Sequence, residues 1–339
     1  MRLLPPAVVL IIAVGLTACA PPQPAPPPPT PSAVTAPTPA PEVIGPVPAF
    51  GGDCTNVLSS EQVESILGPG YSEAATPVSG DISLLGDIDC EWVRSGATGY
   101  SEPGVDTGLP EGMDTIAVVA LPADVVKMDL SEPRCDPKYD ATMCRMSRIV
   151  DGVWLMARAG WHLSSPPVEQ LDAALTAAAA NLASFPPPVA ARSDSDWWEL
   201  PACDDIAVRI GLSAFLGEGF HSGFWEGSLQ PEDQLRDDAG MLRLCPWSTE
   251  GASAGPDQEF HIVTLHIMPG GALRWDALLA RADATEISVA GAQAAIRVGD
   301  EVFATDGVNT LGVVTGDAHP DDSALAVALA ERALAALAT

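Results

Sequence analysis

The sequence contains very little lysine, and it has no second long apolar run after its first residues. Of its 339 residues, only Lys127 and Lys138 are lysine, and 16 basic residues face 45 acidic ones, so the net charge is −29. A chain this acidic is repelled by nucleic acid and by anionic lipid head groups. We therefore expect no nucleic-acid partner, and we interpret the charge, which is spread along the chain, as a solvated surface that keeps the protein soluble.

Catalytic and cofactor motifs are missing as well. The sequence contains no serine-hydrolase elbow, P-loop, HExxH pair or EF-hand loop. No His/Cys cluster has the spacing of a zinc site. The glycine-rich stretch from Gly217 to Gly223 lacks dinucleotide-binding spacing and is better explained as a helix stop and turn. We therefore expect no metal, no cofactor and no enzymatic activity.

The N-terminal residues are typical of an export signal. Met1-Arg2 is followed by an apolar run from Ala7 to Leu16, which is shorter than the roughly 20 residues that a membrane-spanning helix needs. The run ends in Leu16-Thr-Ala-Cys19, which resembles the bacterial lipobox. The sequence thus predicts a lipoprotein signal peptide over residues 1–18 and lipidation of Cys19. An ordinary signal peptide cleaved near Ala18 is the alternative.

Proline dominates the next segment, with 13 prolines between Ala20 and Phe50. Proline fixes φ and favours extended polyproline II, so we predict a semi-rigid, lipidated tether over residues 19–52. Its expected role is to hold the folded part away from a membrane, at the outer face of which the lipid on Cys19 would anchor the protein.

The remainder repeats an ordered set of residues at matched spacing. Cys54 and Cys203 each precede a Leu-Gly pair, and 14 residues separate each cysteine from its glycine. A Cys-x-Trp motif follows in each half, at Cys90-Glu-Trp92 and Cys245-Pro-Trp247. An Asp-Gly pair comes 61 residues after each of these cysteines, and an Ala/Leu-rich helix closes each half. These matches predict a tandem duplication.

The expected fold is α+β, with two tandem related domains over residues 53–185 and 199–339 and a linker over 186–198. Each domain is predicted to contain a short N-terminal helix, an antiparallel sheet and a closing C-terminal helix, over Val168–Leu182 and Ser323–Leu337. Ser59 and Gln62 form a capping-box sequence at the start of the first helix. The Asp-Gly pairs at 151 and 306 indicate hairpins.

The repeat also predicts how the cysteines pair. Six remain when Cys19 carries lipid, and an even number in an exported chain indicates disulfides. Equivalent positions in the two halves give Cys54–Cys90 and Cys203–Cys245. Elimination then leaves Cys135 and Cys144, in a loop without a counterpart in the second half. Trp92 and Trp247 are expected to cover the two equivalent bridges.

These motifs resemble a domain of unknown function carried by many actinobacterial extracytoplasmic lipoproteins. That domain begins with a cysteine, a short helix and Leu-Gly, and continues with a Cys-x-Trp strand. The resemblance departs from the family in having two copies and the extra cysteine pair. It implies an extracytoplasmic α+β module and supplies no catalytic residues.

Aromatic residues mark one candidate binding region. Trp197 and Trp198 lie where the linker enters the second half, and Trp225 follows. They are predicted either to line a ligand cleft between the halves or to hold the halves together by packing, and we favour packing.

The leading functional hypothesis is a non-enzymatic binding or interaction module at the cell envelope. Its partner would be an envelope protein, a cell-wall component or a small molecule, besides the membrane that the lipid enters. The alternatives are a wall-associated hydrolase that uses paired carboxylates and a purely structural envelope protein.

Overall fold

Local sequence signals begin and end the first elements. The Ser59 side chain accepts a hydrogen bond from the Gln62 N–H and Gln62 bonds back to Ser59, which completes the predicted capping box. The helix ends at Gly68, whose φ of 87° favours glycine. Asp151 and Gly152, with φ of 49° and 80°, form the predicted two-residue hairpin.

The computed structural model describes residues 45–74, 84–94, 112–128, 130–138, 141–162, 168–192, 196–216, 220–223, 231–249, 262–315 and 322–338. Cys19, Trp225 and the predicted signal peptide lie outside these residues, as does most of the predicted tether. Within the described ranges, no helix combines the length and apolarity needed to cross a membrane.

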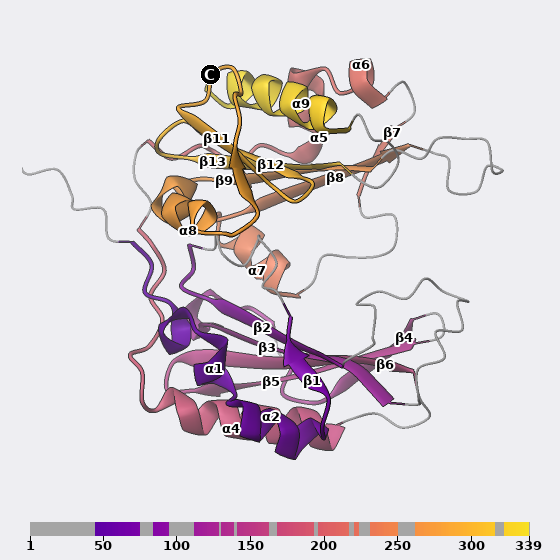
Figure 1. The fold of residues 1–339 in the computed structure, drawn as a ribbon, viewed down its shortest axis with the longest axis vertical. Helices are drawn as coiled ribbons and strands as arrows, with labels where there is room; N and C mark the ends of the chain where they lie inside the picture. Colours follow the sequence, from indigo (N-terminus) through magenta and orange to yellow (C-terminus); the bar gives the residue numbers. More distant parts are fainter. Residues whose placement is uncertain are drawn as a thin grey trace, which may run out of the picture. The chain divides into compact units, whose positions relative to one another are not determined.

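The first half has its helices mainly at its ends (Figure 1). Its elements are η1 (Ala49–Gly52), α1 (Cys54–Val57), α2 (Ser60–Leu67), β1 (Tyr71–Glu73), β2 (Ile88–Arg94), β3 (Gly112–Pro122), η2 (Ala123–Val125), β4 (Arg134–Lys138), β5 (Ala141–Val150), β6 (Val153–His162) and α4 (Val168–Leu182).

Among the described residues, the second half has more helical segments between its strands. Its elements are α5 (Cys203–Ile210), α6 (Ser213–Leu216), β7 (Phe220–Ser222), α7 (Pro231–Asp238), β8 (Arg243–Thr249), β9 (Ile262–Met268), η3 (Gly271–Arg274), α8 (Trp275–Leu279), β10 (Ala284–Glu286), β11 (Ala294–Val298), β12 (Glu301–Thr305), β13 (Thr310–Thr315) and α9 (Asp322–Leu337).

Both sheets are antiparallel, so the fold is α+β as predicted. The first sheet has the order β1-β2-β3-β6-β5-β4, and the second has the order β7-β8-β9-β13-β12-β11-β10. In each sheet, the first three strands follow one another inward from one edge. The chain then crosses to the opposite edge, and the remaining strands form a meander that ends beside the third strand. The two orders correspond strand for strand, with β10 as an additional edge strand of the second sheet.

Helices cover one face of each sheet and enclose its core. In the first half, α1, α2 and α4 pack on residues such as Val118 and Leu155. In the second half, α5 and α9 pack on residues such as Leu265 and Val313. We call this the helix-covered face of each sheet, and the opposite side its outer face. The closing helices α4 and α9 agree with the predicted ranges to within a residue.

The six described cysteines pair as the repeat predicts. Cys54–Cys90 joins α1 to β2 and Cys203–Cys245 joins α5 to β8, with Cα–Cα distances of 5.5 and 5.2 Å. Trp92 and Trp247 lie in the same cores as these bridges. The third bridge, Cys135–Cys144, links directly opposed residues of β4 and β5. The prediction of a loop without a counterpart was wrong, because the two cysteines lie in paired strands that correspond to β11 and β12 in the sheet order.

The folded chain begins earlier than the predicted start at Asp53. Val47 forms a β-bridge with Val189, and Phe50 is fully buried, with its ring centroid 5.9 Å from that of Phe185. The proline content predicted an extended tether up to residue 52. That end point was wrong, because burying the large aromatic side chain of Phe50 releases more free energy than leaving this segment extended in solvent. Residues Val43–Thr339 form one compact unit.

Candidate functional site

Helix α7 is short and mostly charged, yet some of its side chains are buried. Pro231 occupies its first position, where no N–H is needed, and Glu232 and Asp233 follow in the first turn, where acids favour the helix dipole. Leu235 and Arg236 are nevertheless buried, with exposures of 0 % and 2 %. A short, highly charged helix that buries an arginine must satisfy that charge inside the protein.

Leu235 joins α7 to the outer face of the first sheet. It packs in an apolar cluster with residues of the first half and its preceding loops, namely Leu85, Val119, Leu121, Leu130, Trp154 and Met156. At the other end of α7, Arg243 of β8 pairs with Asp237 at 2.8 Å. The helix therefore belongs to the second half in sequence and contacts both sheets.

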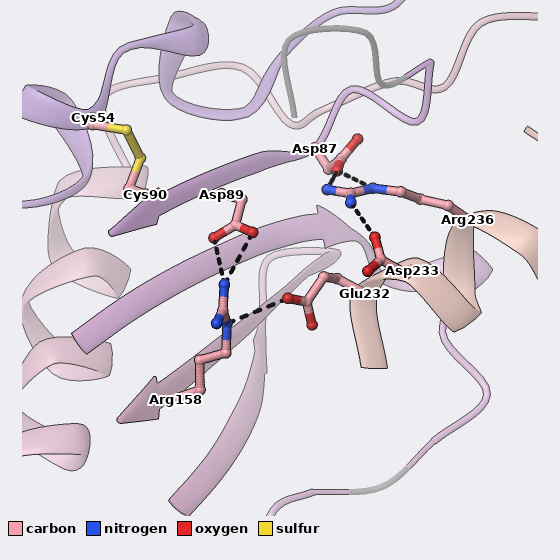
Figure 2. A network of polar contacts seen from close by, with 8 residues as sticks. All are labelled: Cys54, Asp87, Asp89, Cys90, Arg158, Glu232, Asp233 and Arg236. Atoms are coloured by element: carbon pink, nitrogen blue, oxygen red, sulfur yellow. Dashed lines mark hydrogen bonds and ion pairs between the residues drawn. A yellow bond between two sulfur atoms is a disulfide. The ribbon is translucent and has the colours of Figure 1, made fainter. Parts of the chain in front are cut away.

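Arg236 makes the central polar contact of this site (Figure 2). Its Nε and Nη2 donate to Oδ2 of Asp87, at 2.9 and 2.5 Å, and its Nη1 donates to Asp233 at 2.7 Å. Asp87 precedes β2 and is also buried. The guanidinium group thus joins residues that are 149 positions apart in the sequence.

A second arginine extends the network along the outer face of the first sheet. Arg158 of β6 donates through Nη2 to Asp89 of β2 at 3.3 Å, and its Nε forms an ion pair with Glu232 Oε1 at 3.3 Å. The other oxygen of Glu232, Oε2, is buried and has no hydrogen-bond partner among the described residues. Glu232 is therefore held by its ion pair with Arg158, while its second oxygen lacks a hydrogen bond from the described residues.

Carboxylates outnumber guanidinium groups in this network. Five acidic side chains surround the two arginines: Asp87, Asp89, Glu91, Glu232 and Asp233. Burial raises the pKa of Asp87, Glu91 and Glu232, while the guanidinium groups work against the rise. Burial works to lower the pKa of the arginines, but the carboxylates raise it overall, so both stay charged.

A histidine–glutamate pair lies on the outer face of the second sheet, and an acidic residue of α7 affects the pKa of its histidine. His266 Nδ1 lies 2.8 Å from Glu301 Oε1, and both residues are buried. They sit on β9 and β12, on either side of β13, where Gly312 offers no side chain between them. Burial works to lower the pKa of His266, but Glu301 and, further off, Asp233 raise it overall.

The buried carboxylates around α7 are packed against arginines and do not face an open cleft in the described residues. A carboxylate pair that hydrolyses glycosides needs room for the sugar or for water between its members. Here the buried carboxylates Asp87 and Glu232 lie against guanidinium groups, with exposures of 7 % and 2 %.

The predicted aromatic region is attached to the second half. Trp197 lies over Gly270, and Trp198 packs against the core of the second half. The amide of Asn309 fixes the segment: its Oδ1 accepts from the N–H groups of Trp198 and Gly270, and its Nδ2 donates to the Asp196 carbonyl. The described contacts of both tryptophans are therefore within one half, and Trp225 lies outside the described residues.

Among the described residues, no three His, Cys, Asp or Glu side chains are grouped as a metal ion requires. Comparison with family models, with curated proteins and with solved structures finds no match to this chain. The description of the candidate site around α7 therefore rests on the structure of this chain alone.

The sequence did not point to α7 as a site. Its proline start and acidic first turn are signals of a helix, yet they also fit an exposed one. From the sequence, Asp87 and Asp89 look like surface charges at the start of a strand. Their neighbours in the sequence give no sign that Arg236 and Arg158 will face them. The single apolar residue, Leu235, was the only hint of a buried side.

Proposed function

We propose that this protein is a lipoprotein, anchored through Cys19 at the outer face of a membrane, whose folded part is a non-enzymatic binding or interaction module. The observation that carries the proposal is the buried network of α7, in which arginines engage the gathered carboxylates. Such a network joins one helix to both sheets, and its ion-paired, buried groups support a holding role.

The sequence supports the envelope setting. Cys19 follows a short apolar run, and the six later cysteines form three pairs at disulfide distance, which is usual for exported chains. The net charge of −29 disfavours nucleic acid. The partner we propose is an envelope protein, a cell-wall component or a small molecule, and the motifs resemble the actinobacterial lipoprotein domain.

The correspondence of strand order supports a tandem duplication. Independent folds would seldom share an order of β1-β2-β3-β6-β5-β4, a disulfide from first helix to the second strand, and a closing helix on the same face. We propose two related halves, over residues 53–185 and 199–339, of which the first also uses the residues from Val47 onward.

Lipid anchoring is tested by phase partition of the protein expressed in a bacterium that lipidates proteins. Wild-type chain should enter the detergent phase, and Cys19→Ser should remain in the aqueous phase. Equal partition of both would refute the anchor.

Binding and hydrolysis are separated with Glu232→Gln, a variant that keeps the shape of the side chain and removes its charge. Wild type and variant are incubated with purified cell envelopes, and retained protein and released fragments are measured. We expect both proteins to be retained and neither to release fragments. Fragment release by wild type that the variant loses would establish the hydrolase instead.

A further inference from the structure

Three arginines lie side by side across neighbouring strands of the first sheet. Arg134 of β4 is directly opposite Arg145 of β5, and Arg145 is directly opposite Arg158 of β6. Direct partners in antiparallel strands point to the same face, about 5 Å apart. The row therefore runs along the outer face, from the network of α7 to the edge strand β4.

Like charges in such positions repel one another, and only one end of this row is neutralised. Arg158 has Asp89 and Glu232 as partners. Within the part of the chain that the structure describes, neither Arg134 nor Arg145 forms an ion pair or a side-chain hydrogen bond. The Nε of Arg145 is also shielded from solvent and has no hydrogen-bond partner there.

This is unexpected in a protein with 45 acidic residues. Carboxylates are abundant enough to pair with every arginine, and a buried donor left without a partner costs about 1–3 kcal/mol. Among the described residues, carboxylates gather on Arg158, and none pairs with the next two guanidinium groups. An arginine pair kept unneutralised is a natural receptor for an oxyanion from outside the chain.

A hollow opens beside the row. It is lined by Leu130, Ser131, Glu132, Pro133, Arg134 and Cys135. Leu130 is fixed against β5, because its carbonyl accepts from the Ser147 N–H at 2.7 Å. Ser147 is two residues along β5 from Arg145, on the same face, so the segment that forms the hollow runs next to the row. Glu132, which is also in the lining, repels anions inside the hollow itself.

We propose that Arg134 and Arg145 bind a phosphate or carboxylate group of a soluble ligand at the outer face of β4 and β5. The two planar guanidinium groups supply forked donors that match such an oxyanion, and the anion in turn relieves their mutual repulsion. The site deepens the proposed function and rests on it, since it names a ligand class for the binding module.

The acidity of the whole protein shapes the binding. A net charge of −29 repels anions at long range, and this repulsion is screened beyond about 10 Å at 0.1 M salt. Direct contacts with the guanidinium groups are short and less screened. Binding should therefore improve from low to moderate ionic strength before competing anions weaken it, which is opposite to the behaviour of a generally basic surface.

The test uses the full-length purified chain and two probes, inorganic phosphate and acetate, at constant ionic strength. Each probe that binds should raise Tm in a saturable way, by about 3 °C at ten times the half-saturating concentration. Arg145→Gln should weaken the apparent affinity about tenfold or more. Its Tm without anion should equal or exceed that of wild type, because a repulsive neighbour is gone.

Arg148→Gln is the matched control. Arg148 is on the same strand but the other face, where it pairs with Asp172 at 2.7 Å, so the change in net charge is identical. This variant should keep the wild-type anion response and lose a little stability. Arg145→Lys, which keeps the charge and loses the fork, should give an intermediate affinity.

The outcomes separate this site from the function on which it rests. No saturable response to either probe, or an equal loss in Arg145→Gln and Arg148→Gln, would overturn the anion site. If the protein is still retained by envelopes in that case, the binding module stands without it. A response to phosphate alone or acetate alone identifies the group on the ligand.

Discussion

The helix-covered faces of the two sheets are built alike, whereas their outer faces are not. In each half a disulfide ties the first helix to a strand next to a buried tryptophan, and a long helix closes the layer. On the outer faces, the first sheet carries acidic and arginine side chains beneath α7, and the second carries the His266–Glu301 pair and a separate apolar cluster. The two halves therefore agree in the face that carries the core and differ in the face that carries buried charge.

Removing either of the two equivalent disulfides should cause the largest loss of stability, and the loss should be similar in the two halves. Cys54→Ala/Cys90→Ala and Cys203→Ala/Cys245→Ala open loops of 36 and 42 residues, and each should cost about 4 kcal/mol on chain-entropy grounds. Cys135→Ala/Cys144→Ala, with a separation of 9, should cost about 2.5 kcal/mol. Urea titration followed by circular dichroism measures all three. Costs that differ severalfold between the two equivalent pairs would show that the halves are not built alike.

Replacing the central arginine should reveal the difference between the outer faces. Arg236→Met removes the guanidinium group that faces buried Asp87, so the free energy of unfolding should fall by about 3 kcal/mol. Urea titration measures the loss, and Arg209→Met, on the exposed side of α5, should change it by less than about 0.5 kcal/mol.

The double variant Arg236→Met/Asp87→Leu sharpens this result. It replaces both charges of the pair by apolar groups, and it should recover much of the lost stability. A double variant as unstable as the single one would mean that Arg236 acts through packing and not through its charge on Asp87.

A single methyl group should distinguish the two sheets. A Cβ at Gly312 of β13 would lie 2.6 Å from Glu301 Oε1, while a Cβ at Gly160 of β6, the corresponding strand, would come no closer than 3.7 Å to another side chain. Gly312→Ala should therefore cost about 2 kcal/mol through overpacking, and Gly160→Ala much less. Thermal unfolding of both variants decides this, and equal costs would contradict the role given to Gly312.

The smallest expected effect is in the pH dependence of stability. The pKa of His266 is raised above its ordinary 6.5, so the folded protein holds this proton more tightly than the unfolded chain. The resulting stabilisation is complete below pH 6.5 and is lost as pH rises through the raised value. The buried acids act in the same direction at lower pH, since their pKa is also raised.

We therefore expect Tm to fall as pH rises from about 6 to about 9. His266→Gln should flatten the fall in this window, whatever its own Tm, and exposed His221→Gln should retain it. A fall of unchanged steepness in His266→Gln would assign the effect to the net charge and not to this pair.

Features fixed by near neighbours could be predicted from the sequence, and those fixed by distant charges could not. The capping box at Ser59, the Asp151–Gly152 hairpin and the helix Val168–Leu182 depend on residues a few positions apart. Two of the disulfides were predictable because the cysteine motifs recur in the sequence at matched spacing, and elimination gave the third. Arg236 and Asp87 have no such comparison, because the residues that the structure describes between β1 and β2 include no counterpart of α7.

The pairing of the cysteines has a consequence for how the protein matures. Each bridge joins consecutive cysteines along the described chain, 54 with 90, 135 with 144 and 203 with 245, so none encloses or crosses another. In the proposed export, the N-terminal end emerges first, and each cysteine meets its partner before the next pair appears. An oxidant that joins thiols in their order of arrival therefore yields the native set directly, without a disulfide isomerase to correct it.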